Sequence, residues 1–500
     1  MISKIKDSYL KNEKYFDVAK ITLMSLLMLF SLMVPSLINV LLVFAILCVI
    51  TASEFNGVYY CFLLANFRFV FRNNLVGGIP YVTVVFCTFA LTAIIKYWFI
   101  RKEKPKFNWF IIGVSALYLL YLLLPIHKFV FNEYVKFVVM ISILNFLVVF
   151  KDKIDIKKLI LYFATGTIIA SFIFVITQVW FRSSFIEMAE SVVTSFGALR
   201  YRGLAGDPNY YTLDVVIAMA GLYFLYFKRE IKWFIFTPLV MTLSIFIWLT
   251  YSKSMVVGLA VLSGLVIVFS CVKDFKKNWY KPLIFIALIL MGVILTHYVM
   301  DLFTLGIFDR FKDNYVNTSV NEGAIILEQL PAVESPTEVE VVMDNVLTGR
   351  WSLWRNHLIY VFSSVKNFLF GGGIGTFVEP MEAHNTPIQI LYETGFIGTV
   401  IFVALFIFIF KEFGFNKNLF KLSNWINWLV ILICAVMFCN VNYLASTSFT
   451  YHVSIFIFTL FAFNNKNIKE RKEDVNNIHS DIQSRDNSTE VIQEPVGANK

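Results

Sequence analysis

Residues 371–399 read GGGIGTFVEPMEAHNTPIQILYETGFIGT, and the organisation of the chain is best understood from them. A glycine-rich turn is followed by a polar loop with His384 and Asn385, and then by a helix that starts near Pro387 and runs into an apolar segment. A histidine where a hydrophilic loop enters a membrane meets water and lipid head groups together. We therefore expect chemistry at this point. GGGIG at 371–375 follows no strand of a parallel sheet, so it predicts a turn and not a dinucleotide site.

The composition is that of a membrane protein. Hydrophobic residues make up 58% of the chain, aromatic residues 17%, and the mean hydropathy is +0.70. Soluble globular domains are about half apolar or less, so a polytopic membrane protein is expected. The formal net charge of +9 would suggest a nucleic-acid partner in a soluble protein. Lysine-rich loops on one side of a membrane account for it here, and no nucleic-acid partner is expected. All cysteines lie in or beside apolar segments, so neither a disulfide framework nor a zinc site is expected.

Apolar runs of roughly twenty residues predict membrane-spanning helices, because a hydrocarbon core of about 30 Å needs that length of helix. About fourteen runs are present, of which the first three are short, so we expect about 12 to 14 transmembrane helices. The runs lie near 18–34, 37–53, 57–72, 80–99, 107–124, 129–150, 158–181, 209–227, 231–249, 254–271, 282–300, 388–410, 425–442 and 447–463. The predicted fold class is all-α, a polytopic membrane helical bundle with one large extracytoplasmic loop.

Four regions follow from these runs. They are a transmembrane bundle over 1–300, the large extracytoplasmic loop over 301–387, the last three spans over 388–463 and a polar, disordered cytoplasmic tail over 464–500. The N-terminal segment is rich in lysine and lacks a small-residue cleavage site, so the first span is expected to be retained.

Lysine and arginine collect on one predicted side of the bundle, together with the N-terminus. The basic segments on that side are 101–106, 151–158, 228–232, 273–281 and 411–421. The positive-inside rule places this side, and both termini, in the cytoplasm.

The large loop is expected to carry an amphipathic helix. Between Asp313 and Asp344 the loop has seven acids and no base, which suits the outer side. Apolar residues then recur at steps of three and four: Trp351, Trp354, Leu358, Val361, Phe362 and Val365. Such a helix either lies on the outer leaflet or packs against its own bundle.

The first of three polar clusters on the expected outer side is RYRGLAGDPNYYTLD, residues 200–214. Arg200 and Arg202 supply fixed positive charge, and Pro208 opens a helix whose N-terminus favours anions. A solvated loop before a helix is the alternative. Asp214 argues against it, because an ionisable group about one turn inside a membrane is costly and usually has a partner.

The second cluster is TYSKS, residues 250–254. Lys253 either meets a phosphate as a point charge or extends its amine to the lipid head groups, and for this residue alone the second interpretation is favoured.

The third cluster belongs to the large loop. Arg350 and Arg355 lie near the start of its helix, and His384 lies near its end. A lone histidine is more often structural than catalytic, and structural roles are expected for His127, His297, His357, His452 and His479. His384 differs from these, because it stands beside Asn385 before a helix N-terminus, with Glu393 about two turns further on.

In this order the three clusters resemble the O-antigen ligase and O-antigen polymerase superfamily of bacterial membrane glycosyltransferases. The residues that carry the resemblance are Arg200, Gly203, Pro208 and Asn209 of R-x-x-G-x-x-x-D-P-N, the T-x-S-K of 250–253, Arg350 and Trp354, LFGGGIGTF, and His384, Asn385, Glu393, Gly395 and Gly398 of AHNTPIQILYETGFIG. The likeness covers about residues 195–410 and is specific as an ordered set. Lys253 departs from the family's common arginine, which removes a two-pronged donor, and Asp207 stands where asparagine is frequent.

The resemblance implies a metal-independent, inverting transfer of a glycan from undecaprenyl pyrophosphate to an acceptor hydroxyl, without a cofactor, on the outer face of a bacterial cell membrane. Arg200 and Arg350 would hold the pyrophosphate by paired hydrogen bonds, with Arg202 and Lys253 in support. His384 would be the base that accepts the hydroxyl proton.

The remaining residues of the clusters have supporting roles in this interpretation. Glu393, or another acid, would orient the imidazole of His384, and Asp214 and Asn385 would support the site. The expected partners are the polyprenyl-pyrophosphate-linked donor, a glycan acceptor and the lipid bilayer, together with a flippase and a chain-length regulator.

Several functions share these features. Polymerisation of repeat units into a capsular, O-antigen-like or other surface polysaccharide is the main expectation, and a ligase that moves finished glycan to a terminal acceptor uses the same chemistry. A transporter or flippase for lipid-linked sugars would need internal repeats and ionisable residues near the bilayer midplane. A membrane scaffold or sensor without activity is a further class.

Overall fold

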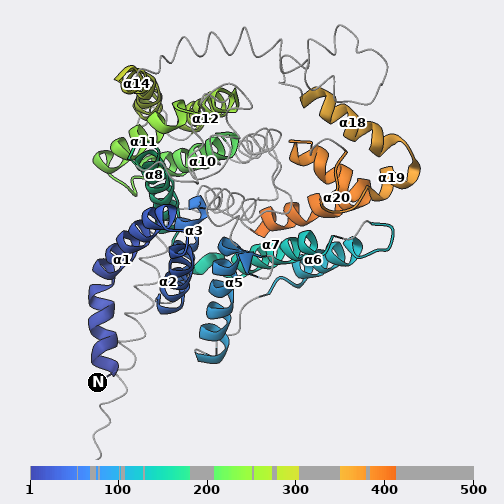
Figure 1. Ribbon diagram of the computed structural model, residues 1–500, viewed down its shortest axis with the longest axis horizontal. Helices are drawn as coiled ribbons and strands as arrows, with labels where there is room; N and C mark the ends of the chain where they lie inside the picture. The colour runs from blue at the N-terminus through green and yellow to red at the C-terminus, as the bar shows by residue number, and fades with distance from the viewer. Residues whose placement is uncertain are drawn as a thin grey trace, which may run out of the picture.

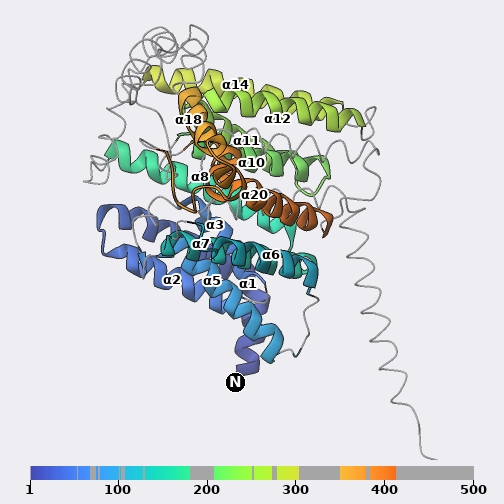
Figure 2. The same cartoon turned by 90° about the vertical axis from the view of Figure 1, so that its right-hand side faces the viewer.

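The computed structural model of the protein describes residues 2–52, 55–67, 75–76, 79–100, 102, 107–127, 130–180, 208–250, 253–272, 279–302, 350–378 and 383–412. Within these ranges the chain is helical apart from one antiparallel pair of two-residue strands, β1 (Leu75–Val76) and β2 (Ile79–Pro80), in which Leu75 is opposite Pro80. The helices lie side by side as a bundle (Figures 1 and 2). The all-α prediction is confirmed for this part of the chain.

The first half of the bundle begins with a long helix, α1, and contains short 3-10 and π segments. Its elements are α1 (Ile2–Met33), α2 (Leu37–Thr51), α3 (Gly57–Leu64), η1 (Ala65–Phe67), α5 (Tyr81–Ile94), η2 (Ile95–Ile100), α6 (Trp109–Leu122), α7 (Phe131–Val149), η3 (Lys151–Lys153) and α8 (Ile156–Trp180).

The second half has two groups of helices. The elements are α10 (Pro208–Phe227), α11 (Trp233–Trp248), α12 (Lys253–Val272) and α14 (Tyr280–Leu302), followed by α18 (Arg350–Phe362), α19 (Val365–Phe370) and α20 (Thr386–Glu412). Each predicted apolar run within the described ranges falls on a helix. The run at 57–72 is the least well matched, because helical structure there ends at Phe67.

Among the described residues, five helical segments are long and apolar enough to cross a membrane: Tyr15–Met33, Tyr81–Ile100, Ile156–Ile176, Tyr280–Tyr298 and Thr386–Glu412. The apolar segments found in the other helices are shorter, at 10–17 residues, as in Phe137–Val149 of α7 and Tyr211–Phe227 of α10. Membrane character is therefore supported, whereas the expected number of spans stays a prediction. The predicted spans at 425–442 and 447–463, the tail at 464–500 and most of the large loop lie outside the described residues.

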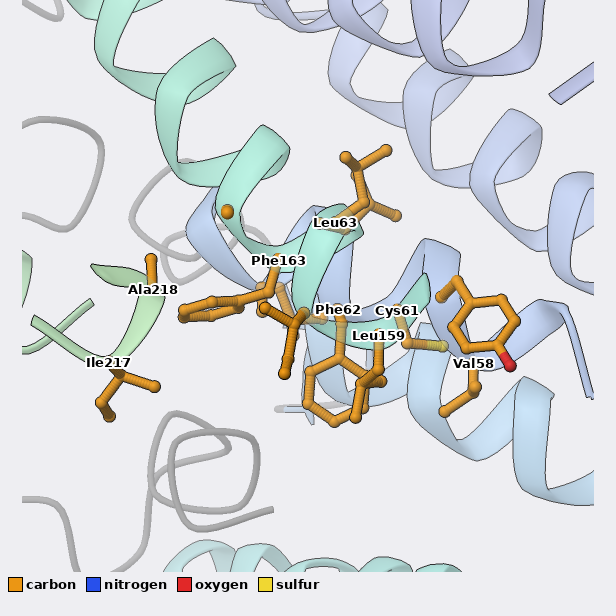
Figure 3. Close-up of a cluster of buried hydrophobic side chains, with 14 of the residues drawn as sticks. Val58, Cys61, Phe62, Leu63, Leu159, Phe163, Ile217 and Ala218 are labelled. Atoms are coloured by element: carbon orange, nitrogen blue, oxygen red, sulfur yellow. The ribbon is translucent and has the colours of Figure 1, made fainter. Parts of the chain in front are cut away.

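A cluster of buried apolar side chains lies where α3 packs against α8 (Figure 3). Phe62 of α3 and Phe163 of α8 are completely buried, and Ile217 of α10 lies on the other side of Phe163. A Cβ on Gly166 would come within 2.3 Å of the Leu63 carbonyl oxygen, so this crossing requires a residue without a side chain.

Polar side chains also join these two helices. The Asn66 side-chain amide donates to the Phe163 carbonyl at 3.2 Å, and the Thr167 hydroxyl donates to the Asn66 side-chain oxygen at 3.0 Å. Hydrogen bonds of this kind hold helices together in lipid, where the hydrophobic effect between helices is absent.

Basic residues from separate loops meet at one end of the bundle. Lys151 Nζ lies 3.0 Å from a carboxylate oxygen of Glu412, whose other oxygen accepts from the Asn108 amide. Lys153 lies over the ring of Tyr97. These contacts join the starts of α6 and α8 to the end of α20. We call this the basic end; segment 151–158 meets Glu412 there, next to Lys411, while residues 413–421 lie outside the described ranges.

The helices lead from the basic end to the opposite end of the bundle. α8 starts at the basic end, and Tyr211 in the first turns of α10 hydrogen-bonds Ser171 in the second half of α8, so the two helices are antiparallel. α14 starts beside the end of α10, where Lys281 Nζ donates to the Phe227 carbonyl. The end opposite the basic one therefore contains the starts of α10, α12 and α20 and the ends of α8 and α14. Figure 2 shows α14 and α20 running along the length of the bundle.

Candidate functional site

The candidate site is built on a break in α20. Gly395 has φ 63° and ψ −173°, which interrupts the helix nine residues after it begins at Thr386. The carbonyls just before the break accept hydrogen bonds from outside the helix: Tyr392 O from Gly372 N at 2.7 Å, and Glu393 O from Gly373 N at 2.9 Å. A broken helix is tolerated at membrane depth only where other groups satisfy its backbone, and the glycine-rich turn performs this function.

A third carbonyl at the break is satisfied from α6. The Tyr121 hydroxyl donates to Thr394 O at 2.7 Å, and it also lies 3.3 Å from Leu369 O at the end of α19. The turn that the sequence predicted at 371–375 is thus a structural support for α20, and α6, α19 and the turn converge on the same half-turn of helix.

The start of α20 matches the predicted helix near Pro387. Asn385 is the N-cap by geometry, because its side-chain oxygen accepts from Ile388 N at 3.2 Å and its carbonyl accepts from Gln389 N at 2.9 Å. His384, just before it, is half-buried and has φ 47°, the left-handed region that costs a residue with a side chain free energy. Such strained residues gather at functional sites.

A residue that sequence reasoning missed connects the parts of this site. Gln389 is 1% exposed, and its side-chain oxygen accepts from Ala383 N at 3.1 Å. Its side-chain nitrogen donates to Thr376 O at 2.9 Å and to a carboxylate oxygen of Glu393 at 2.7 Å. One amide thus joins the glycine-rich turn, the histidine loop and the buried acid.

The spacing of polar residues on α20 is the signal that would have found it. Asn385, Gln389 and Glu393 recur at steps of four and share one face of a helix that is otherwise apolar. All three are buried, at 4%, 1% and 4% exposed. Buried polar side chains require partners, so a stripe of this kind indicates an internal network.

α18 lies against the start of α20 (Figure 1). The indole nitrogen of Trp354 donates to Ala383 O at 2.9 Å, the carbonyl just before His384. Arg350, the first residue of α18, stands one turn before Trp354 and therefore on the same face of the helix. The Trp354 bond thus brings the first turns of α18 close to the carbonyl before His384. That Arg350 and His384 share one pocket stays a prediction.

The predicted amphipathic helix is present but shorter than expected. α18 ends at Phe362, and Ser364 caps a separate helix, α19, by accepting from Asn367 N at 3.1 Å. Leu353, His357 and Val361 of α18 are buried, while Phe362 is 64% exposed. The helix therefore packs one face on the bundle, and the interpretation that it packs against its own bundle is the one the contacts favour.

Two of the histidines for which structural roles were expected have buried side chains. His357 is fully buried, with Nδ1 2.8 Å from Leu353 O and Nε2 3.4 Å from Val378 N. Both ring nitrogens thus face backbone groups. His127 is 6% exposed and packs edge-on against Tyr121.

The other predicted site residues are only partly described. Arg200 and Arg202 lie outside the described residues, between the end of α8 and the start of α10. Lys253 is the first residue of α12, and Pro208 opens α10 as predicted. Pro208 and Lys253 therefore lie at the end of the bundle where α20 begins.

Asp214 of α10 is 1% exposed. Within the described ranges, no three His, Cys, Asp or Glu side chains are grouped so that they could hold a metal ion. The described residues of α18, α20 and the turn before α20 include the guanidinium group of Arg350, the carboxylate of Glu393 and the imidazole of His384.

No known protein family, curated protein or solved structure matches the chain.

Proposed function

We propose that the chain is a membrane glycosyltransferase that joins undecaprenyl-pyrophosphate-linked oligosaccharide repeat units into a surface polysaccharide on the outer face of the membrane. The observation that carries the proposal is that the starts of α10, α12, α18 and α20 lie at one end of the bundle. These starts are the positions of the polar clusters, which are far apart in the sequence.

The opposite, basic end supports the proposed orientation. Lys151, Lys153 and Lys411 gather there, and lysines near membrane spans favour the cytoplasm. The histidine end would then face outward, where surface polysaccharides are assembled.

The reaction would proceed by direct displacement. The acceptor hydroxyl oxygen attacks the anomeric carbon and forms the new glycosidic bond, while the bond from that carbon to the pyrophosphate oxygen breaks and its electron pair leaves with undecaprenyl pyrophosphate. His384 accepts the hydroxyl proton. Arg350, with Arg200 and Arg202, stabilises the negative charge that develops on the pyrophosphate. Attack from the face opposite the leaving group inverts the anomeric centre.

The broken helix favours a second candidate of another class. Transporters often bind substrate at discontinuous helices near the bilayer midplane, and Glu393 is a buried carboxylate directly beside the break at Gly395. A transporter for the same lipid-linked sugars would move the donor across the bilayer without cleaving it. A ligase that transfers finished glycan differs from the polymerase only in its acceptor.

One reconstitution separates the three. Purified protein in liposomes receives an undecaprenyl-pyrophosphate-linked repeat unit, with EDTA present, and undecaprenyl pyrophosphate and glycan length are followed by mass spectrometry. The proposal predicts release of undecaprenyl pyrophosphate and a series of longer glycans. A single transfer to a separate acceptor would indicate the ligase, and donor that changes leaflet uncleaved would indicate the transporter.

A further inference from the structure

Both backbone groups of Ala383 are held by side chains from different helices. Its N–H donates to the Gln389 side-chain oxygen of α20 at 3.1 Å, and its carbonyl accepts from the Trp354 indole of α18 at 2.9 Å. Ala383 itself is fully buried. A backbone unit held from both sides in a buried position has little freedom to rotate.

His384 follows directly and has a left-handed backbone. Its φ of 47° is unfavourable for a side chain larger than that of glycine, so surrounding contacts must hold it. On its other side, Asn385 is fixed as the N-cap of α20 through Ile388 N and Gln389 N. The histidine is therefore the short strained link between two anchored neighbours.

The amide of Gln389 has one orientation that satisfies its contacts. Its nitrogen is placed between two acceptors, Thr376 O and a Glu393 carboxylate oxygen, and its oxygen faces the Ala383 N–H. Turning the amide over would bring oxygen against both acceptors and NH₂ against a donor. Glu393 thus fixes the direction of Gln389, and Gln389 fixes Ala383.

We propose that Gln389 and Trp354 are positioning residues that hold the Ala383 backbone and thereby direct the His384 imidazole toward the acceptor hydroxyl. The effect on catalysis rests on the proposed function. The effect on the imidazole does not, and it is measurable without substrate. Glu393 would then act on the imidazole through Gln389 and Ala383.

The test compares Trp354→Phe and Gln389→Leu with a matched control, Trp351→Phe. Trp351 lies on the same helix, and its indole nitrogen has no hydrogen-bond partner among the described residues. Each tryptophan variant keeps an aromatic ring and loses one N–H, but only Trp354→Phe removes the bond to Ala383. Gln389→Leu removes three buried hydrogen bonds and is the more disruptive change. If Gln389→Leu does not fold, Trp354→Phe alone decides the test.

The first readout is the rate at which diethyl pyrocarbonate modifies His384 in the purified full-length protein, followed by peptide mass spectrometry. We expect this rate to change at least about threefold in Trp354→Phe and Gln389→Leu, since losing one net hydrogen bond shifts a local equilibrium by about that much or more. Trp351→Phe should match the unmodified sequence. Rates unchanged in both test variants would overturn the inference, as would an equal change in the control.

The second readout is transfer activity. Misplacement of a catalytic group by about 1 Å costs about 10²-fold, so we expect kcat to fall about 10- to 100-fold in both variants while KM stays within about twofold. In a His384→Ala background, neither Trp354→Phe nor Gln389→Leu should lower the residual transfer rate further. A merely structural role of these residues would lower the residual rate again. A further loss would therefore overturn the positioning role. If His384→Ala itself leaves transfer intact while the modification rates change as expected, the proposed function fails and the positioning stands.

Discussion

Gly371 and Gly395 lie backbone to backbone, although 24 positions separate them in the chain: a Cβ on Gly371 would come within 2.5 Å of Gly395 N. A Cβ on Gly395 would come within 2.5 Å of the Leu369 carbonyl. Both residues have positive φ, at 74° and 63°. The close approach is what allows the turn to donate hydrogen bonds to the carbonyls at the break in α20.

Replacement of either glycine by alanine should therefore destabilise the protein. We expect Gly371→Ala and Gly395→Ala each to lower the free energy of unfolding by at least about 2 kcal/mol, from backbone strain together with a steric clash. Thermal unfolding in detergent measures this as a lower Tm. Gly264→Ala in α12 is the control, because its Cβ would meet nothing within 4 Å, and alanine there favours the helix. Equal Tm values at Gly395→Ala and the control would show that the break is not required.

Lys281 closes the end of α10. It is 2% exposed, its Nζ donates to Phe227 O at 3.0 Å, and it lies over the rings of Tyr226 and Phe227. Lys281→Met keeps the length of the side chain but leaves that helix-terminal carbonyl without this donor. We expect a loss of about 1 to 3 kcal/mol in stability, read from the Tm in detergent. Lys366→Met, at an exposed position on α19, should stay within about 0.5 kcal/mol.

His127 should make the fold sensitive to acid. It lies in the connection between α6 and α7, and burial lowers the pKa of its imidazole from 6.5. Neither ring nitrogen has a hydrogen-bond partner among the described residues. The unfolded chain therefore binds a proton at a higher pH than the folded chain does, so this contribution to stability is present above about pH 6.5 and is lost as the pH falls through the lowered pKa.

The measurement is the Tm between pH 8 and pH 5 for the unmodified protein and for His127→Phe, which keeps a ring beside Tyr121. The variant should lose less of its Tm on acidification. Parallel curves for the two proteins would contradict a role of His127 in the acid response.

Much of the helical arrangement could be predicted because apolar runs and caps are local signals. The start of α20 at Thr386, after Asn385, and the start of α10 at Pro208 are examples. The break at Gly395 could not be predicted, since a glycine inside an apolar run is compatible with a continuous helix and only the distant turn at Gly371 requires the change of direction. The end of α18 at Phe362 was likewise hidden, because the apolar spacing continues through Val365 while Ser364 begins a new helix.

The candidate site was predictable in part for the same reason. His384, Asn385 and Arg350 were identifiable from residue type and position before or within a predicted helix. The strained φ of His384 and the contacts of Gln389 depend on tertiary structure. Polar residues four apart on an apolar helix, such as Asn385, Gln389 and Glu393, indicate a buried hydrogen-bond network in a membrane protein.

If His384 is the base of a glycosyl transfer, His384→Ala should lose the group that accepts the hydroxyl proton. The measurement is the initial rate of undecaprenyl pyrophosphate release in liposomes, with His297→Ala on α14 as the matched histidine control. We expect the rate to fall about 10²- to 10⁴-fold in His384→Ala and to stay within about twofold in His297→Ala, with unchanged Tm values for both. A rate for His384→Ala equal to that of the control, in protein that is equally folded, would contradict the role of His384 as the base.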